Sequence, residues 1–315
     1  MNEPTSDLTV RVDGRTDVGA DLAVLQLVPA DAAALPAWEP GAHIDVLLPS
    51  GLVRQYSLCG TDAGRWRIAV LREPAGRGGS AWLHAHARPG TMLGVAGPRN
   101  HFAFEASGDP VLLIAGGVGI TPILPMVTAA VAAGSDVVLH YAGHEGRMAF
   151  VDELAAQLGD RLVLHVSGQR QRLDVDAVLG SAKPGTVVRC CGPLGLVDAA
   201  ERAATAYGLD FHAERFVAEP LSPPVWTGDF EVEMASSGLT VTVPPDRSIL
   251  EVAEENGVFV LSSCHEGTCG TCETPVLEGA VDHRDSILTP AEREGGDLMY
   301  ICVSRAACPR LVLEL

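Results

Sequence analysis

The sequence is poor in basic residues and has no long apolar run. Its 315 residues include 22 Lys and Arg against 40 Asp and Glu, a formal net charge of -18 at pH 7. A chain with so few basic residues lacks the clustered cations of a nucleic-acid-binding surface. No run approaches the roughly 18 apolar residues that cross a bilayer, and the N-terminus shows no signal segment. We predict a folded, cytoplasmic protein that binds neither nucleic acid nor membrane.

Internal repeats and low-complexity tracts are also missing, and the cysteines do not predict disulfides. Four of the eight cysteines fall in one motif, and Cys59, Cys190, Cys191 and Cys308 are scattered. The hydrophobic content of 47% and the mean hydropathy of +0.20 indicate well-formed cores. The length suits two or three domains.

Acidic residues concentrate at the C-terminal end. Residues 228–315 carry 16 Asp and Glu against 5 Lys and Arg, a charge of -11, so the other 227 residues carry the remaining -7. An acidic body of this kind predicts attraction to a basic partner surface. A solvated face that only keeps the protein soluble is the alternative.

The most informative stretch runs from Leu261 to Cys302. Cys264, Cys269 and Cys272 stand at C-x4-C-x2-C, and Cys302 follows after 29 intervening residues. This is the plant-type spacing for four thiolates on one [2Fe-2S] cluster. The motif therefore predicts a one-electron carrier.

Small residues in the same loop suit a cluster. Gly267 and Gly270 let backbone amides turn toward the sulfurs, and the neighbouring Ser and Thr side chains offer further hydrogen bonds. A zinc ribbon is the alternative, but it usually has a C-x2-C pair at both ends, which Cys302 lacks. A Rieske centre needs two histidine ligands at set spacing. His265, directly after the first cysteine, is interpreted as a partly exposed loop residue.

The segment SCHEGTCGTCETPVLEG and residues 228–315 around it resemble a plant-type ferredoxin. The resemblance implies an α+β domain of the β-grasp type.

Residues 1–106 alternate short apolar runs with turn residues, which predicts a small antiparallel β-barrel. The barrel contains R-x-Y-S at residues 54–57 and R-G-G-S at residues 77–80, the latter before a short helix. Glycines before a helix N-terminus suit a phosphate, because free amides and the helix dipole point outward there.

Together these two motifs resemble the flavin domain of the ferredoxin-reductase superfamily. The resemblance implies that Arg54 contacts the flavin phosphate, that Tyr56 lies against the isoalloxazine and that Ser57 hydrogen-bonds near N5. The other implied flavin contacts are Ala69, Val70, Gly79 and Ser80. A short R-G-G-S loop combined with a C-terminal ferredoxin resembles the phthalate dioxygenase reductase family, which implies FMN, with FAD as the alternative.

Residues 107–219 alternate strand-like and helix-like segments, which predicts an α/β domain with a parallel sheet. GGVG at residues 116–119 departs from the strict dinucleotide fingerprint, and a turn of this kind can also be structural. It resembles the pyridine-nucleotide motif of the same family. The resemblance implies nucleotide contacts at Gly117, Gly119, Thr121, Pro122, Cys191, Gly192 and Pro193.

Three further residues bear on the nucleotide. Cys191 is interpreted as a wall beside the nicotinamide and not as a nucleophile, since no His or Asn lies near it in sequence. Glu145, in the turn at residues 142–147, predicts NADH because a carboxylate repels a 2'-phosphate, although Arg147 leaves NADPH open. Phe216 matches an aromatic that covers the flavin in this family, or it is a core residue.

Residues 220–227 are Pro-rich and predict a semi-rigid linker.

The resemblance implies an NADH-dependent oxidoreductase that passes electrons from NADH to FMN, to [2Fe-2S] and on to a terminal oxygenase. Ser57, Cys191 and Phe216 are the residues expected at the hydride-transfer site. The implied acceptor is a Rieske non-haem iron enzyme that hydroxylates or demethylates an aromatic. A cytochrome P450 as acceptor, or a redox-sensing protein without turnover, are the alternatives.

Overall fold

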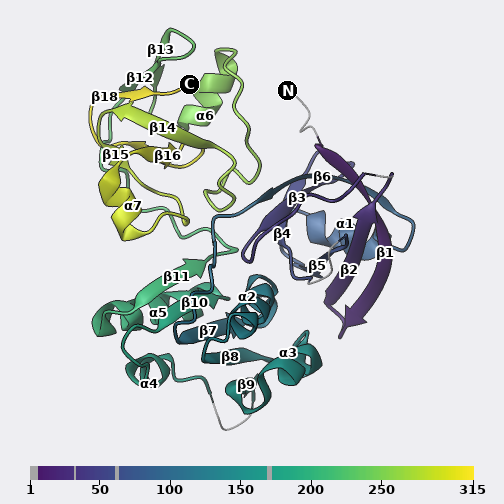
Figure 1. The fold of residues 1–315 in the computed structure, drawn as a ribbon. Helices are drawn as coiled ribbons and strands as arrows, with labels where there is room; N and C mark the ends of the chain where they lie inside the picture. Colours follow the sequence, from purple (N-terminus) through teal and green to yellow (C-terminus); the bar gives the residue numbers. More distant parts are fainter. Residues whose placement is uncertain (1–5, 32, 61–63, 169–171) are drawn as a thin grey trace. The chain divides into compact units, whose positions relative to one another are not determined.

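The chain forms two compact units, Met1–Phe216 and Val217–Leu315 (Figure 1). The computed structural model describes residues 6–31, 33–60, 64–168 and 172–315. Residues 1–5, the start of the N-terminal stretch considered above, lie outside the described residues. Among the described helices, none is both long and apolar enough to cross a membrane.

The first sheet is antiparallel, with strand order β4-β3-β6-β1-β2-β5. Its strands are β1 (Leu8–Val18), β2 (Leu22–Pro29), β3 (His43–Leu47), β4 (Val53–Ser57), β5 (Trp66–Leu71) and β6 (Met92–Arg99). The edge strands β4 and β5 touch, so the sheet curls into a barrel around buried Val10, Ile44 and Trp66. Helix α1 (Gly79–His86) follows β5. The predicted antiparallel barrel is confirmed.

The second sheet is parallel, with strand order β11-β10-β7-β8-β9. Its strands are β7 (Val111–Gly116), β8 (Val137–His144), β9 (Leu162–Ser167), β10 (Val187–Cys191) and β11 (Asp210–Glu214). One face packs on α2 (Ile120–Ala132) and α3 (Val151–Leu158), and the other packs on α4 (Val175–Gly180) and α5 (Leu194–Tyr207). The order of the strands reverses between β7 and β10, since β8 and β9 follow on one side of β7 and β10 and β11 on the other. Open α/β sheets bind their ligands at such a point.

The sequence pattern predicts a helix over residues 148–158, but helix α3 begins at Val151, because Phe150 has a left-handed backbone with φ 61°. Strand β8 continues to His144, so the turn expected at residues 142–147 is shorter. Helix α4 was not expected. Two 3-10 turns, η1 (Gly117–Gly119) and η2 (Gly159–Arg161), complete this part.

The second unit has a mixed sheet with strand order β13-β12-β18-β14-β16. Its strands are β12 (Phe230–Met234), β13 (Leu239–Val243), β14 (Glu273–Glu278), β16 (Leu298–Tyr300) and β18 (Arg310–Leu313), and β15 (Val281–Asp282) pairs with β17 (Arg305–Ala306). Strands β12 and β18 are parallel. Helices α6 (Ile249–Glu255) and α7 (Pro290–Gly295) both begin with a capping box. This α+β arrangement agrees with the predicted β-grasp fold.

One arginine ties the barrel to the parallel sheet's helix layer. Arg67 on β5 donates two hydrogen bonds to the carboxylate of Glu153 on α3, at 2.9 and 3.0 Å, and two to the carbonyl oxygen of Cys59, at 3.1 and 2.6 Å. Its guanidinium also lies 4.6 Å from the centroid of the Phe150 ring. Because these contacts are partly shielded from solvent and the pair is bidentate, we expect them to be stronger than fully exposed ion pairs.

Replacing Arg67 by Ala should therefore destabilise the first unit. We expect the free energy of unfolding to fall by about 2 to 4 kcal/mol, since several charge-assisted bonds are lost and the Cys59 carbonyl loses its donors. Urea unfolding followed by far-UV circular dichroism measures the change. Arg65→Ala, which removes a more exposed arginine paired with Asp13, is the control. Equal unfolding midpoints for both variants would contradict this role.

Candidate functional site

Four buried cysteines meet in the second unit. Cys264, Cys269, Cys272 and Cys302 are between 2% and 9% exposed. The sulfur of Cys264 is in hydrogen-bond contact with those of Cys269 and Cys302, and Cys302 contacts Cys272 in the same way. The hydrogen bonds that Cys264 accepts from the other two thiols lower its pKa. The four predicted ligands therefore share one site.

The backbone around this site is arranged to hold negative charge. The amides of Glu266 and Thr268 donate to the Cys264 sulfur at 3.3 and 3.4 Å, and the Thr271 hydroxyl lies 3.2 Å from the Cys269 sulfur. Gly267 and Gly270 have φ of 69° and 73°, which turns the loop around the sulfurs. Within the described residues no three His, Cys, Asp or Glu surround a single ion. A [2Fe-2S] cluster takes two cysteine sulfurs on each iron, and the four cysteines fit that requirement.

The predicted flavin contacts lie on β4, β5 and α1. A Cβ atom on Gly79 would lie 2.7 Å from Cγ and 2.8 Å from Nε of Arg54, so the start of α1 packs directly on that arginine. Gly78, the residue before the helix, has φ 91°. The two halves of the predicted phosphate site are thus adjacent.

Other flavin candidates have partners within the barrel. The Ser80 hydroxyl accepts from the amide of Glu73 at 3.0 Å. The Val70 carbonyl lies 2.9 Å from Nε2 of His84, so that oxygen is engaged. Ala69 is buried in a cluster that includes Val118 of the glycine-rich turn. Burial raises the pKa of Tyr56, whose hydroxyl therefore stays protonated.

The two halves of the predicted nucleotide motif meet at the carboxyl ends of β7 and β10. A Cβ atom on Gly119 would lie 2.3 Å from the carbonyl oxygen of Cys191, and one on Gly116 would lie 2.6 Å from Pro193. Gly192 is similarly close to Gly116, at 3.0 Å. Only glycine permits this approach of the two turns, which meet at the switch point where open α/β sheets bind their ligands.

Some motif residues support the turn from below. Thr121 is 2% exposed, and its hydroxyl donates to the Val118 carbonyl at 2.9 Å. Pro122 is buried in the first turn of α2. Tyr141, a residue that the sequence analysis missed, donates to the Gly117 carbonyl at 3.3 Å and accepts from the amide of Ala149 at 3.1 Å. Gly117 remains partly exposed at the tip.

The turn that predicts nucleotide preference is exposed at the end of β8. Glu145 lies at its tip. Arg147, the residue that left NADPH open, pairs with Asp21 at 2.8 Å. Its charge is therefore partly offset in this conformation.

Phe216 ends the first unit and is 40% exposed, so it is not a core residue. It follows β11 by two residues, next to the carboxyl ends of β10 and β11.

A buried glutamate links the flavin and nucleotide candidates. Glu214, the last residue of β11, pairs in register with Cys191 on β10, and its carboxylate accepts a hydrogen bond from the Ser57 hydroxyl. Burial raises the pKa of Glu214 to about 8, although the Ser57 bond opposes the shift. Burial, together with Glu214, also raises the pKa of Cys191, which keeps that fully buried thiol neutral. A neutral thiol can line the site, but it is a poor nucleophile.

Glu214 is not predicted from the sequence, because within residues 212–216 (HAERF) only Phe216 matches a residue known from the family. The available signal was positional. In a parallel sheet the carboxyl ends of adjacent strands lie at one edge, so the last residue of β11 had to adjoin the cysteine that ends β10.

Known proteins resemble this chain in sequence and in structure. Residues 232–307 match the family model of the 2Fe-2S iron-sulfur cluster binding domain. The chain is 43% identical over 305 residues to phenoxybenzoate dioxygenase subunit beta of Ectopseudomonas oleovorans, covering 94% of each chain.

Two solved structures share the whole arrangement of elements. Phthalate dioxygenase reductase, described as a modular structure for electron transfer from pyridine nucleotides to [2Fe-2S], is 34% identical with a TM-score of 0.69 and 98% coverage of both chains. An intact type IV self-sufficient cytochrome P450 monooxygenase is 38% identical with a TM-score of 0.90. That match covers 98% of this chain but only 41% of the longer one.

Glu214 predicts a pH-dependent stability. Its pKa is about 8 in the folded chain against 4.5 for an ordinary glutamate, so the folded state holds the proton more tightly. The stability is therefore full below pH 4.5 and falls as the pH rises through about 8. Glu214→Gln removes this loss.

We expect the thermal midpoint of Glu214→Gln, relative to the parent, to rise steadily from pH 5 to pH 9. Differential scanning fluorimetry on the full chain measures it. The exposed Glu105→Gln is the matched control and should show a flat difference. A flat difference for Glu214→Gln as well would mean that the Glu214 carboxyl titrates normally.

Proposed function

Because this chain belongs to the phthalate dioxygenase reductase family of oxygenase reductases, we propose that it carries electrons from NADH through FMN and its [2Fe-2S] cluster to a terminal oxygenase. The observation that supports this most strongly is the bond between Ser57 and Glu214, in register with Cys191. Through Glu214 it brings the flavin candidate Ser57 close to the nicotinamide candidate Cys191.

The two bound groups supply the redox chemistry: a nicotinamide gives two electrons as hydride, a flavin accepts them, and a cluster takes one at a time. The protein residues orient and shield. Arg54, Gly79 and Ser80 hold the flavin phosphate at the start of α1. Gly117 and Gly119 give the nucleotide a close approach, with Thr121 and Pro122 supporting that turn and Gly192 and Pro193 opposite. Ser57 and Cys191 border the place where hydride passes, and Phe216 covers the flavin.

The preference for NADH is supported by charge at the end of β8. Glu145 repels a 2'-phosphate and accepts from ribose hydroxyls, while Arg147 pairs with Asp21. A flavin phosphate is supported by the packing of Gly79, at the start of α1, on Arg54. FMN in place of FAD is supported by the similarity to phthalate dioxygenase reductase. We assign the FMN domain to residues 1–106, the NAD domain to 107–219, the linker to 220–227 and the ferredoxin domain to 228–315.

The acceptor is proposed to be a Rieske non-haem iron oxygenase that hydroxylates or O-demethylates an aromatic. The relative that matches along 94% of its own length is named as a subunit of a phenoxybenzoate dioxygenase. A cytochrome P450 is the second candidate, since a P450 monooxygenase contains a similar segment within a longer chain. None of the eight cysteines forms a disulfide, which supports a place in the cytoplasm.

Flavin content tests the branch of the family. Acid release from the purified protein should give FMN at about one per chain, and Arg54→Ala should lower that content several-fold, because a guanidinium on a phosphate is a strong charge-assisted contact. Arg65→Ala on the same barrel is the control. Stoichiometric FAD in the parent would overturn the FMN assignment, and full FMN in Arg54→Ala would remove this arginine from the site.

Cluster removal tests the order of the carriers. Cys272→Ser should abolish reduction of cytochrome c by NADH and leave reduction of ferricyanide, which takes electrons from the flavin. Cys308→Ser, a cysteine of the same unit outside the cluster motif, should keep both activities. Cytochrome c reduction that survives in Cys272→Ser would show that electrons bypass the cluster.

A further inference from the structure

An exposed apolar pair lies beside the cluster motif. After α6 the chain alternates between solvent and core: Phe259 is 65% exposed, Val260 is 9% exposed and Leu261 is 61% exposed. Two large apolar side chains therefore face solvent, two positions apart. Adjacent exposed apolar side chains on a soluble protein are typical of an interaction site.

Val260 anchors this pair to the core that contains the cluster ligands. It belongs to the same hydrophobic core as Cys272 and Cys302, and Leu261 precedes Cys264 by three residues. The four sulfurs are themselves buried. Electrons must therefore leave through the thin layer of protein over the cluster, and an acceptor has to approach a surface near it.

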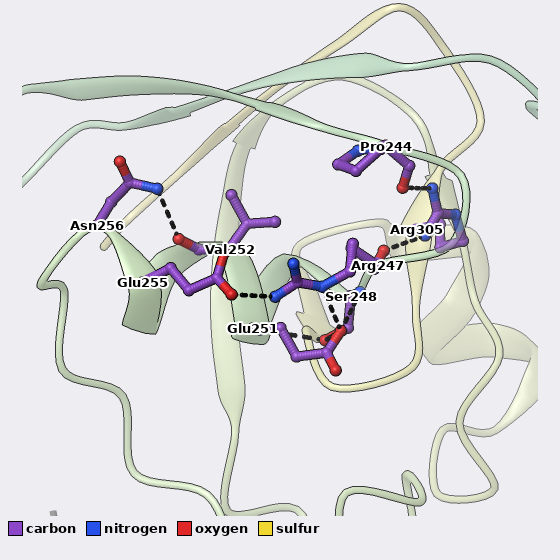
Figure 2. Close-up of polar contacts among 8 residues, drawn as sticks. All are labelled: Pro244, Arg247, Ser248, Glu251, Val252, Glu255, Asn256 and Arg305. Carbon is purple, nitrogen blue, oxygen red and sulfur yellow. Dashed lines mark hydrogen bonds and ion pairs between the residues drawn. The ribbon is translucent and has the colours of Figure 1, made fainter. Parts of the chain in front are cut away.

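Acidic side chains surround the apolar pair in sequence. Residues 247–266 contain Glu251, Glu254, Glu255 and Glu266, all exposed, against one cation, Arg247, so the segment has a net charge of -3. Figure 2 shows Arg247 pairing along one side of α6 with Glu255, at 2.7 Å, and with Glu251, at 3.4 Å. This pairing offsets only part of the negative charge.

The helix that precedes the pair is anchored to the cluster segment. Arg305, 4% exposed and three residues after Cys302, donates to the carbonyl oxygens of Arg247 and of Pro244 (Figure 2). These bonds tie the start of α6 to the segment that carries the fourth cluster ligand. At the other end of the helix, Asn256 donates to the carbonyl of Val252 at 2.9 Å. A preorganised surface loses little entropy when a partner binds.

We propose that Phe259 and Leu261 form the apolar centre of a docking surface for a separate, basic electron-acceptor protein, with the acidic residues as its rim. This rests on the proposed function. An apolar centre within a charged rim is the usual anatomy of a protein interface. A second copy of the chain, with a charge of -18, is repelled, and residues 1–227 carry -7, so neither complements the rim.

The test compares three rates in the full, cofactor-loaded protein. Stopped flow measures cluster reduction by NADH within the chain and cluster oxidation by cytochrome c, a basic electron acceptor, and ferricyanide reports the flavin. The test variant is Phe259→Ser with Leu261→Ser. Its matched control is Leu239→Ser, an exposed leucine on β13, at the opposite edge of the sheet from β16.

We expect the double variant to lower the second-order rate with cytochrome c about 5- to 30-fold, as the loss of an apolar hot spot does, and to leave the other two rates unchanged. Glu254→Lys should also slow that reaction, and the difference from the parent should shrink as salt rises. Glu231→Lys, on β12, should have little effect.

A rate with cytochrome c equal to that of the Leu239→Ser control would overturn the docking surface. Slower cluster reduction by NADH in the double variant would show that the pair contacts the first unit instead. A parent protein that dimerises, and a double variant that does not, would assign the face to a second copy. Failure of the parent to reduce cytochrome c at all, with ferricyanide reduction intact, would overturn the proposed function itself.

Discussion

The close contact of two glycine-rich turns at the switch point of the parallel sheet determines the rest of the hydride-transfer site. Gly119 can lie against the Cys191 carbonyl only because it has no side chain. The parallel pairing of β7 with β10 brings their carboxyl ends together, and the missing side chain at Gly119 lets the turns that follow them approach each other. The next strand, β11, then places Glu214 beside Cys191, where the carboxyl reaches Ser57 of the barrel. The contact between the barrel and the parallel sheet at this site thus depends on glycines that carry no Cβ atom.

A second constraint is the mismatch between a two-electron donor and a one-electron acceptor. The chain meets it with two separately folded units. The first has the features of a flavin and nucleotide site in one compact unit, and the second buries four cysteines in its own core. Burial of the cluster ligands protects them from solvent but lengthens the path to a partner. The exposed pair Phe259 and Leu261 flanks Val260, which belongs to the same core as two of those ligands, and we propose that a partner binds there.

The local features of the sequence predicted much of this. The sequence pattern predicts strands at residues 53–57 and 66–71 and a helix near residues 194–207, and β4, β5 and α5 have these bounds. The cysteine spacing predicted the four cysteines that meet in the second unit. Less predictable were features set by tertiary contact. Helix α3 begins late because Phe150 adopts a left-handed backbone while it packs against Arg67. Glu214 and Tyr141 acquire their roles only from partners distant in sequence, and short α4 has too few residues for a clear periodic signal.

The central claim is that electrons pass from NADH through the flavin to the cluster within one chain. Anaerobic addition of NADH to the purified protein, followed by electron paramagnetic resonance at low temperature, tests it directly. We predict a reduced [2Fe-2S] signal that approaches about one spin per chain and is absent in Cys272→Ser. A flavin that is bleached by NADH while the cluster stays oxidised and silent would contradict it.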